Sequence, residues 1–108
     1  MISFADDVQP IFTQNCTAGC HSGANPPQGL NLSEGVAYGM IVDVPSNESP
    51  LDRIEPGSSA DSYLVHKIDG TQASVGGSGV QMPFGQPQLS EMLRDIIRVW
   101  ADEGALDN

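Results

Sequence analysis

The sequence predicts an all-α fold in which three main helices are joined by long loops. Apolar residues recur at helical spacing in three segments, 3–15, 60–68 and 90–104. The stretches between them are dense in the 12 Gly and 8 Pro of the chain, and none shows the alternation of a β-strand. Nothing in the composition shifts midway, so we expect residues 1–108 to form a single domain.

The first segment is predicted to start at Ser3, because a serine followed three residues later by Asp6 is typical of a helix N-terminus. One face of this helix carries the apolar side chains Phe4, Val8, Ile11 and Phe12. Pro10 has no N–H to donate and clashes with the preceding turn of a helix. The helix therefore either kinks at Pro10 or becomes regular only near Val8.

The other two helices carry start and stop signals as well. Segment 60–68 follows capping serines, has Lys67 near its end and is followed by Gly70. Ser90 caps the clearest helix, which Gly104 ends. The inward faces are predicted to carry Leu64 and Ile68 in the second helix, and Leu93, Ile96, Ile97 and Trp100 in the third.

Long loops leave little regular structure from which to build a core. Residues 22–59 contain only a short apolar run at 40–44, enough for one or two turns of helix. Irregular stretches of this length are uncommon in a small domain unless something organises them. A buried apolar cofactor would do so, since burial contributes roughly 25 cal/mol per Å² whether the surface belongs to a side chain or to a ligand.

The charge balance excludes some partner classes and favours others. The chain has 4 basic and 14 acidic residues, a formal net charge of −10. Nucleic acid and anionic membranes are poor partners for such a surface. A protein partner with a basic docking surface is favoured instead, in an encounter that salt screens. No apolar stretch approaches the roughly 20 residues that cross a bilayer, so we expect no membrane insertion of this segment.

The chemistry-bearing motif is the string CTAGCH, from Cys16 to His21. Two cysteines followed directly by histidine are typical of covalent haem attachment, although the usual motif has two residues between the cysteines and this chain has three. At about 100° per residue, either spacing lets both cysteines face one ligand, and Gly19 can absorb the extra residue. Cys16 and Cys20 supply the thiols that add across two haem vinyl groups, and His21 supplies an imidazole for iron.

The second axial ligand is predicted to be Met82. It lies in the loop string GVQMP, where helix packing does not explain a lone apolar side chain. Met40 and Met92 have ordinary packing explanations, and His66 lies in a helix as a surface or packing residue. A His/Met pair suits electron transfer and raises the reduction potential of the iron.

Taken together, these motifs resemble a class I bacterial c-type cytochrome over nearly the whole chain. The matching features are the N-terminal helix ending in Cys16, Cys20 and His21, the Pro-Gly-Ser string before a Ser-Tyr-Leu helix, Met82-Pro83, and the final helix end WADEGA. The resemblance is closest to small monohaem domains with a long glycine-rich loop between the haem motif and the Met-Pro ligand.

The resemblance implies a cytochrome c-like fold wrapped around one covalently bound haem c, which passes single electrons between redox partners and is not an enzyme. It also implies that the first and last helices cross near one haem edge. Arg53, Tyr63 or Trp100 are implied as donors to the haem propionates, and a carbonyl of Pro26 or Pro27 as the group that orients His21. Haem attachment implies a periplasmic or otherwise extracytoplasmic location, with a signal or anchor absent from this sequence.

Other interpretations of the same residues stay open at this stage. Met82 could be a labile ligand, as in a haem-based small-ligand sensor or a peroxidase-like domain. Cys16 and Cys20 could form a disulfide in a module without haem. Zinc has a suitable set of ligands in Cys16, Cys20, His21 and His66, although their spacing is unlike that of paired zinc ligands.

Overall fold

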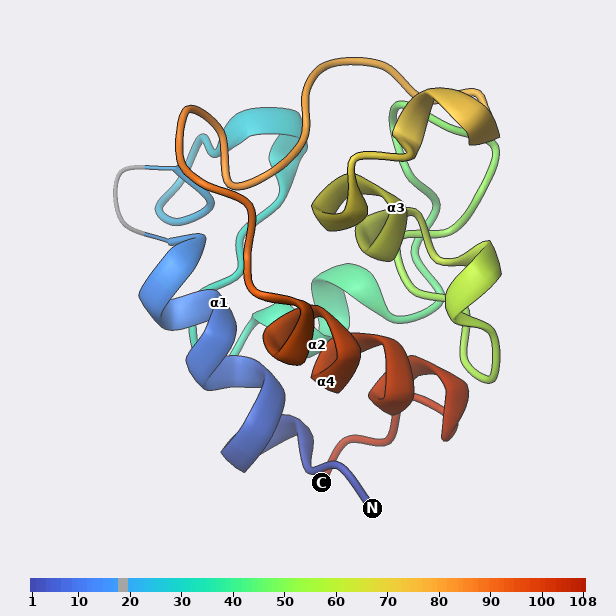
Figure 1. The fold of residues 1–108 in the computed structure, drawn as a ribbon. Helices are drawn as coiled ribbons and strands as arrows, with labels where there is room; N and C mark the ends of the chain where they lie inside the picture. The colour runs from blue at the N-terminus through green and yellow to red at the C-terminus, as the bar shows by residue number, and fades with distance from the viewer. Residues whose placement is uncertain (18–19) are drawn as a thin grey trace.

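A computed structural model describes residues 1–17 and 20–108, and within them the chain is helical with no β-strand (Figure 1). The prediction of an all-α fold is confirmed. The α-helices of the described residues are α1 (Gln9–Asn15), α2 (Ala37–Ile41), α3 (Tyr63–Asp69) and α4 (Glu91–Asp102). Helices α1 and α4 fall within predicted segments, whereas α3 begins three residues later than predicted and ends one residue later. Helix α2 is the short helix of the long middle stretch. None of the described helices has the length and apolar character needed to cross a membrane.

The N-terminal segment starts at the predicted residue and resolves the conflict at Pro10. The Ser3 side chain accepts a hydrogen bond from the backbone N–H of Asp6. A turn of π-helix then spans Phe4–Val8, and regular α-helix begins only at Gln9. Pro10 thereby lies in the first turn of α1, where a backbone N–H has no partner within the helix and the missing donor costs nothing.

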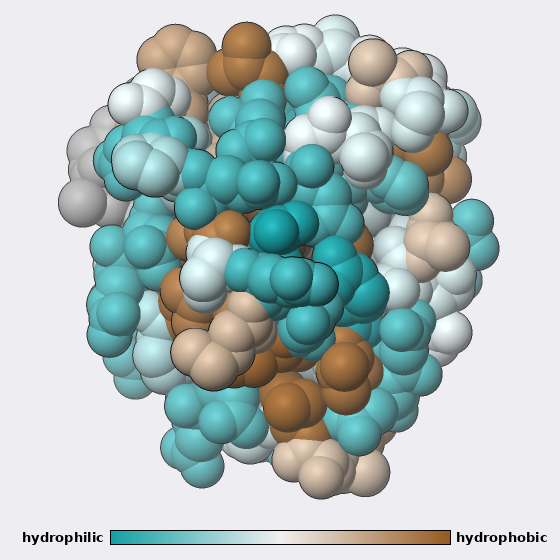
Figure 2. Space-filling model, in the orientation of Figure 1, coloured by the Kyte–Doolittle hydropathy of each residue, from teal (hydrophilic) through white to brown (hydrophobic). Residues whose placement is uncertain are grey.

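Helix α4 begins and packs as its sequence pattern predicts. The Ser90 side chain caps it by accepting from the N–H of Leu93 at 3.3 Å. Ile97 and Trp100 are buried, and Leu93 and Ile96 pack against the core. Met92 is 71% exposed, so the packing explanation given for it from the sequence is wrong. Its position beside the apolar stripe places it past the edge of the buried face, and the face in Figure 2 has apolar surface in the region of α4.

The two ends of the chain meet at a group of rings that we call the aromatic corner: Phe4, Phe12, Tyr38 and Trp100. The Phe4 ring lies 5.1 Å from Trp100 and 5.3 Å from Tyr38, between ring centroids. The Tyr38 hydroxyl donates to the carbonyl of Ala105 at 2.7 Å. Asn108 accepts from the N–H of Phe4 at 2.9 Å, so both termini lie side by side (Figure 1).

The middle stretch is organised by scattered backbone contacts instead of regular structure. Isolated bridges join Val42 to Ile54 and Asp52 to Ser62, which ties the segment after α2 to the start of α3. Ile54 is fully buried in this stretch. These contacts carry Arg53 and Tyr63 to the wall of a pocket that lies between α3 and the segment after α1.

Candidate functional site

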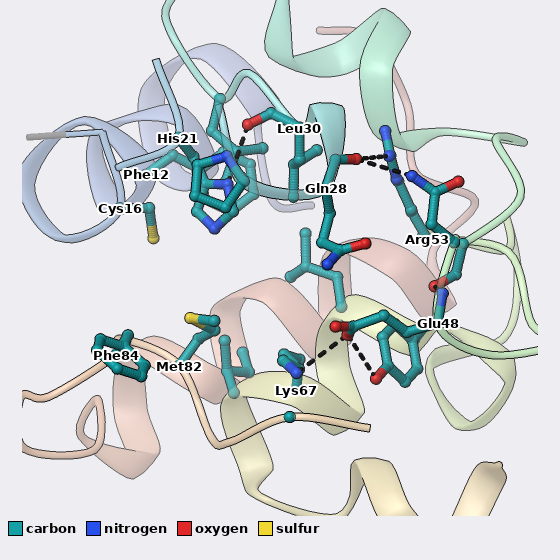
Figure 3. Close-up of a pocket in the computed structure, with 18 of the residues that line it drawn as sticks. Phe12, Cys16, His21, Gln28, Leu30, Glu48, Arg53, Lys67, Met82 and Phe84 are labelled. Carbon is teal, nitrogen blue, oxygen red and sulfur yellow. Dashed lines mark hydrogen bonds and ion pairs between the residues drawn. The ribbon is translucent and has the colours of Figure 1, made fainter. Parts of the chain in front are cut away.

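A pocket of about 320 Å³ is enclosed by the segment that follows α1, helix α3 and the segment that precedes α4. Its volume falls in the range of roughly 300–1,000 Å³ that is usual for small-molecule and cofactor sites. Much of the wall is apolar, formed by Phe12, Leu30, Leu32, Leu64, Ile68, Leu89 and Ile97. Figure 3 shows polar side chains gathered at one end of this space.

His21 is buried on one wall of the pocket and is held by its backbone and its ring. Its N–H donates to the carbonyl of Cys16 at 3.0 Å, and its carbonyl accepts from Leu32 at 2.8 Å. The ring Nδ1 donates to the carbonyl of Leu30 at 3.0 Å. With Nδ1 occupied in this way, the neutral ring keeps the Nε2 lone pair for another ligand.

The carbonyl that orients His21 is therefore that of Leu30, and the assignment to Pro26 or Pro27 is wrong. Both prolyl carbonyls are already engaged in the 3₁₀ turn Pro27–Gly29. Pro26 accepts from Gly29 at 3.0 Å and Pro27 accepts from Leu30 at 3.1 Å. Leu30 directly follows this turn, and its carbonyl is the one that reaches the imidazole.

The two cysteines occupy different environments. Cys16 is half-buried and lines the pocket beside His21, with its sulfur turned into the space (Figure 3). Burial, with a smaller contribution from Cys20, raises the pKa of the Cys16 thiol to about 11. Cys20 is exposed, is not part of the pocket wall, and forms no disulfide with Cys16. Gly19, which we expected to absorb the extra residue of the motif, lies outside the described residues, as does Ala18.

Met82 lies on the wall opposite His21, and the two side chains face each other across the pocket in Figure 3. Its backbone N–H donates to the carbonyl of Lys67 in α3 at 3.0 Å. His66 is not part of the pocket wall. Its Nε2 lies 2.7 Å from the carbonyl of Ala60 and its Nδ1 lies 2.7 Å from the hydroxyl of Thr71, so both ring nitrogens are engaged elsewhere.

The polar end of the pocket contains two of the three residues that we expected to hold propionates. Arg53 lines the wall but donates to the carbonyls of Met40 at 2.8 Å and Gln28 at 2.9 Å. Tyr63 also lines the wall and donates to Glu48 at 2.9 Å. Burial, together with this hydrogen bond, raises the pKa of the Tyr63 hydroxyl.

Trp100 is not available at the pocket, so its assignment as a propionate donor is wrong. It is 1% exposed in the aromatic corner and is not part of the pocket wall. Its indole Nε1 donates to the carbonyl of Leu106 at 3.0 Å. The chain end folds back after α4 and takes this donor, which the sequence pattern alone does not reveal.

Sequence reasoning missed Lys67 and Glu48 as pocket residues. Their side chains are 11% and 16% exposed and lie 3.0 Å apart, between Nζ and Oε1. We interpreted Lys67 only as a helix-end residue. A signal was present, because Lys67 follows the inward residue Leu64 by three positions and therefore shares its face of the helix. Glu48 lies in an irregular segment and offers no comparable pattern.

The residues proposed as a zinc set are not brought together. Among the described residues, one grouping of three potential metal-ligating side chains occurs, and it consists of Asp43, Asp52 and Glu55. Comparisons of the chain with protein-family models, curated proteins and solved structures gave no significant match. The arrangement of side chains in the pocket is therefore the basis for a functional proposal.

The pocket suits a haem in its donors and its walls. An imidazole with a free Nε2 and a thioether lie on opposite walls, which is the arrangement that two axial ligands require. The Cys16 thiol lies beside the imidazole, and apolar side chains surround the donors. Cys20 lies off the wall, and covalent attachment through either thiol stays a prediction.

Proposed function

We propose that this chain is a monohaem c-type cytochrome that transfers single electrons between redox partners. The observation that carries the proposal is the placement of His21 and Met82 on opposite walls of one largely apolar pocket, with Cys16 beside the histidine. Such a donor pair favours a carrier over an enzyme, because both axial positions of the iron are filled and no open position is left for a substrate.

Each of these residues has a distinct role in the proposal. His21 would bind iron through Nε2, and the Leu30 carbonyl keeps its ring in one tautomer and orientation. Met82 would supply the second ligand, and Cys16, with Cys20 as the predicted second thiol, would hold the group covalently. When bound, haem supplies a one-electron centre. The apolar walls exclude water from it, which limits the reorganisation that accompanies a change of charge.

The proposed partner is a redox protein with a basic docking surface. The formal net charge of −10 favours attraction to such a surface at long range. Because salt screens this attraction, the bimolecular rate of electron transfer should fall as ionic strength rises. Covalent haem attachment further points to an extracytoplasmic location for the protein.

A second candidate function is a haem-based ligand sensor or peroxidase-like domain. It is favoured by the exposure of Gly79 and Val80, which immediately precede Gln81 and Met82 in an irregular stretch. If Met82 dissociates readily, a small ligand reaches the iron. Carbon monoxide binding to the reduced protein discriminates the two functions, because a carrier with a firmly bound methionine resists it at neutral pH.

The test uses the protein made in cells that can attach haem. A rise in denatured mass by one haem, with sharp low-spin bands on reduction, is the expected result. Met82→Ala should convert the spectrum to high spin or open the iron to carbon monoxide. Met92→Ala is the matched control, because Met92 is 71% exposed and remote from the pocket wall. If the wild-type protein made in these cells is colourless, the proposed function is wrong.

A further inference from the structure

A buried charge pair stands beside the proposed methionine ligand, and neither partner has a part in the function proposed above. Lys67 lies in the seven-residue helix α3 and is 9% exposed as a residue. Its Nζ donates to Glu48 Oε1 at 3.0 Å and to the carbonyl of Ser78 at 2.6 Å. A buried lysine is costly unless it is paired in this way, so its position calls for a physical reason.

The segment Ser78–Met82 is fastened to α3 and its neighbour at several points. Lys67 holds it at both ends, since its side chain binds the Ser78 carbonyl and its own carbonyl accepts from the Met82 N–H at 3.0 Å. Between these points, the Gln72 side chain donates to the carbonyl of Gly79 at 3.1 Å. The segment has no regular secondary structure, so these bonds determine where Met82 lies.

Gly79 leaves room for the contact between the Lys67 ammonium and this segment. Its φ is +76°, and a Cβ built on it would lie 2.8 Å from Lys67 Nζ. A side chain here would push the ammonium away from Ser78 as well as strain the backbone. The glycine-rich approach to Met82 is thus fitted closely around the Lys67 ammonium, and its composition does not by itself indicate a loose segment.

We propose that Lys67, neutralised by Glu48, is a positioning residue for Met82. It fixes the segment Ser78–Met82 against α3, so that the thioether stays on the wall opposite His21. The consequence at the iron rests on the proposed function. If the tether is removed, the methionine should dissociate more often, and the carrier should acquire the behaviour of the ligand-binding alternative. The charge pair therefore sets which of the two functions the pocket performs.

The experiment compares haem-loaded wild type with a double variant, Glu48→Gln with Lys67→Leu, which adds no second thioether to the pocket wall. Changing both residues removes the tether without leaving a lone buried carboxylate. We expect weakening of the far-red absorption band that reports thioether ligation to ferric iron. Carbon monoxide should bind the reduced variant about tenfold faster, because a charge-assisted hydrogen bond typically accounts for at least a factor of ten in an equilibrium.

The control variant is Arg98→Met. It breaks the ion pair with Asp69 between α3 and α4, which lies outside the pocket wall, and so loosens the fold without touching the tether. It should keep the wild-type band and the wild-type carbon monoxide rate. If the double variant also keeps both, or if Arg98→Met loses them equally, the positioning role is wrong.

Amide hydrogen exchange separates this proposal from the proposed function. The Met82 amide should exchange about tenfold faster in the double variant, while amides of α4 keep their protection. If Met82→Ala leaves the wild-type spectrum unchanged, methionine ligation is wrong. Amide exchange alone then decides whether Lys67 holds the segment. If the Met82 amide exchanges at the same rate in the double variant as in wild type, the positioning role of Lys67 is wrong.

Discussion

The aromatic corner and the pocket are built by different means. In the corner, rings from both ends of the chain pack directly, and Trp100 is 1% exposed with its one donor satisfied. Around the pocket, irregular segments are held by hydrogen bonds to backbone carbonyls, as at Leu30, Ser78 and Gln28. The corner is complete as protein alone, whereas the pocket walls enclose space that side chains do not fill. This difference predicts that, if haem binds as proposed, the second region depends on it for stability.

The largest expected effect therefore comes from removing haem. At about 24 cal/mol per Å³ of cavity, an unfilled pocket of about 320 Å³ costs at most about 8 kcal/mol. This cost is comparable to the whole stability of a domain, about 5–15 kcal/mol. We expect the haem-free chain to unfold at a much lower temperature than the haem-loaded protein. A haem-free chain that melts cooperatively at the holoprotein temperature would contradict the dependence.

A second prediction is that the packing of the aromatic corner can be weakened without a change in the pocket. Trp100→Ala should destabilise the haem-loaded protein by about 3–5 kcal/mol, through lost burial and a cavity among the rings. Denaturant unfolding measures the loss. Val99→Ala, on the same helix and 42% exposed, should change stability by no more than about 0.5 kcal/mol. Below the unfolding transition, the iron spectrum of Trp100→Ala should match wild type, and a changed axial ligation would show that the regions are coupled.

The two regions are linked by Asp69 of α3, which accepts from Arg94 at 2.9 Å and from Arg98 at 2.8 Å in α4. Asp69→Asn should lower stability by about 1 kcal/mol, since the carboxylate is 19% exposed and solvent screens part of the interaction. The loss should shrink in high salt. Asp95→Asn serves as the control, because Asp95 is 51% exposed and pairs only with Arg98. Equal losses of stability in both variants would show that the ion pairs between α3 and α4 contribute no more than the exposed pair of Asp95 does.

The contrast between the regions also explains what the sequence could predict. Helical spacing and capping residues report local forces, so the start at Ser3 and the buried face of α4 were predictable. The strings CTAGCH and GVQMP likewise identified His21, Cys16 and Met82, which the structure brings to one pocket, and Cys20, which lies off its wall. The partner of the His21 ring was not predictable, because it lies nine residues further along, directly after the turn Pro27–Gly29. Glu48 was missed for a related reason, since only tertiary contacts between irregular segments bring it to Lys67.

The smallest expected effect concerns Glu55, which lies close to Asp43 and Asp52 on the segment that also contains Arg53. A hydrogen bond to Asp52, followed by partial burial and the neighbouring carboxylates, raises the pKa of Glu55 above its usual 4.5. The fold therefore binds this proton more tightly than the unfolded chain does, and stability falls as pH rises through the window just above 4.5.

Glu55→Gln should consequently stabilise the protein slightly at pH 7 and leave its stability unchanged at pH 3, where the wild-type carboxyl is already protonated. Thermal unfolding of the haem-loaded protein at the two pH values measures the difference. Glu34→Gln controls for the change in net charge, since Glu34 is exposed and outside this acidic group. A gain of equal size at both pH values would mean that repulsion at Glu55 is not its cause. In that case, repulsion between carboxylates would not destabilise the segment that supports the pocket. This segment, like the aromatic corner, would then have a stability independent of the charge on Glu55.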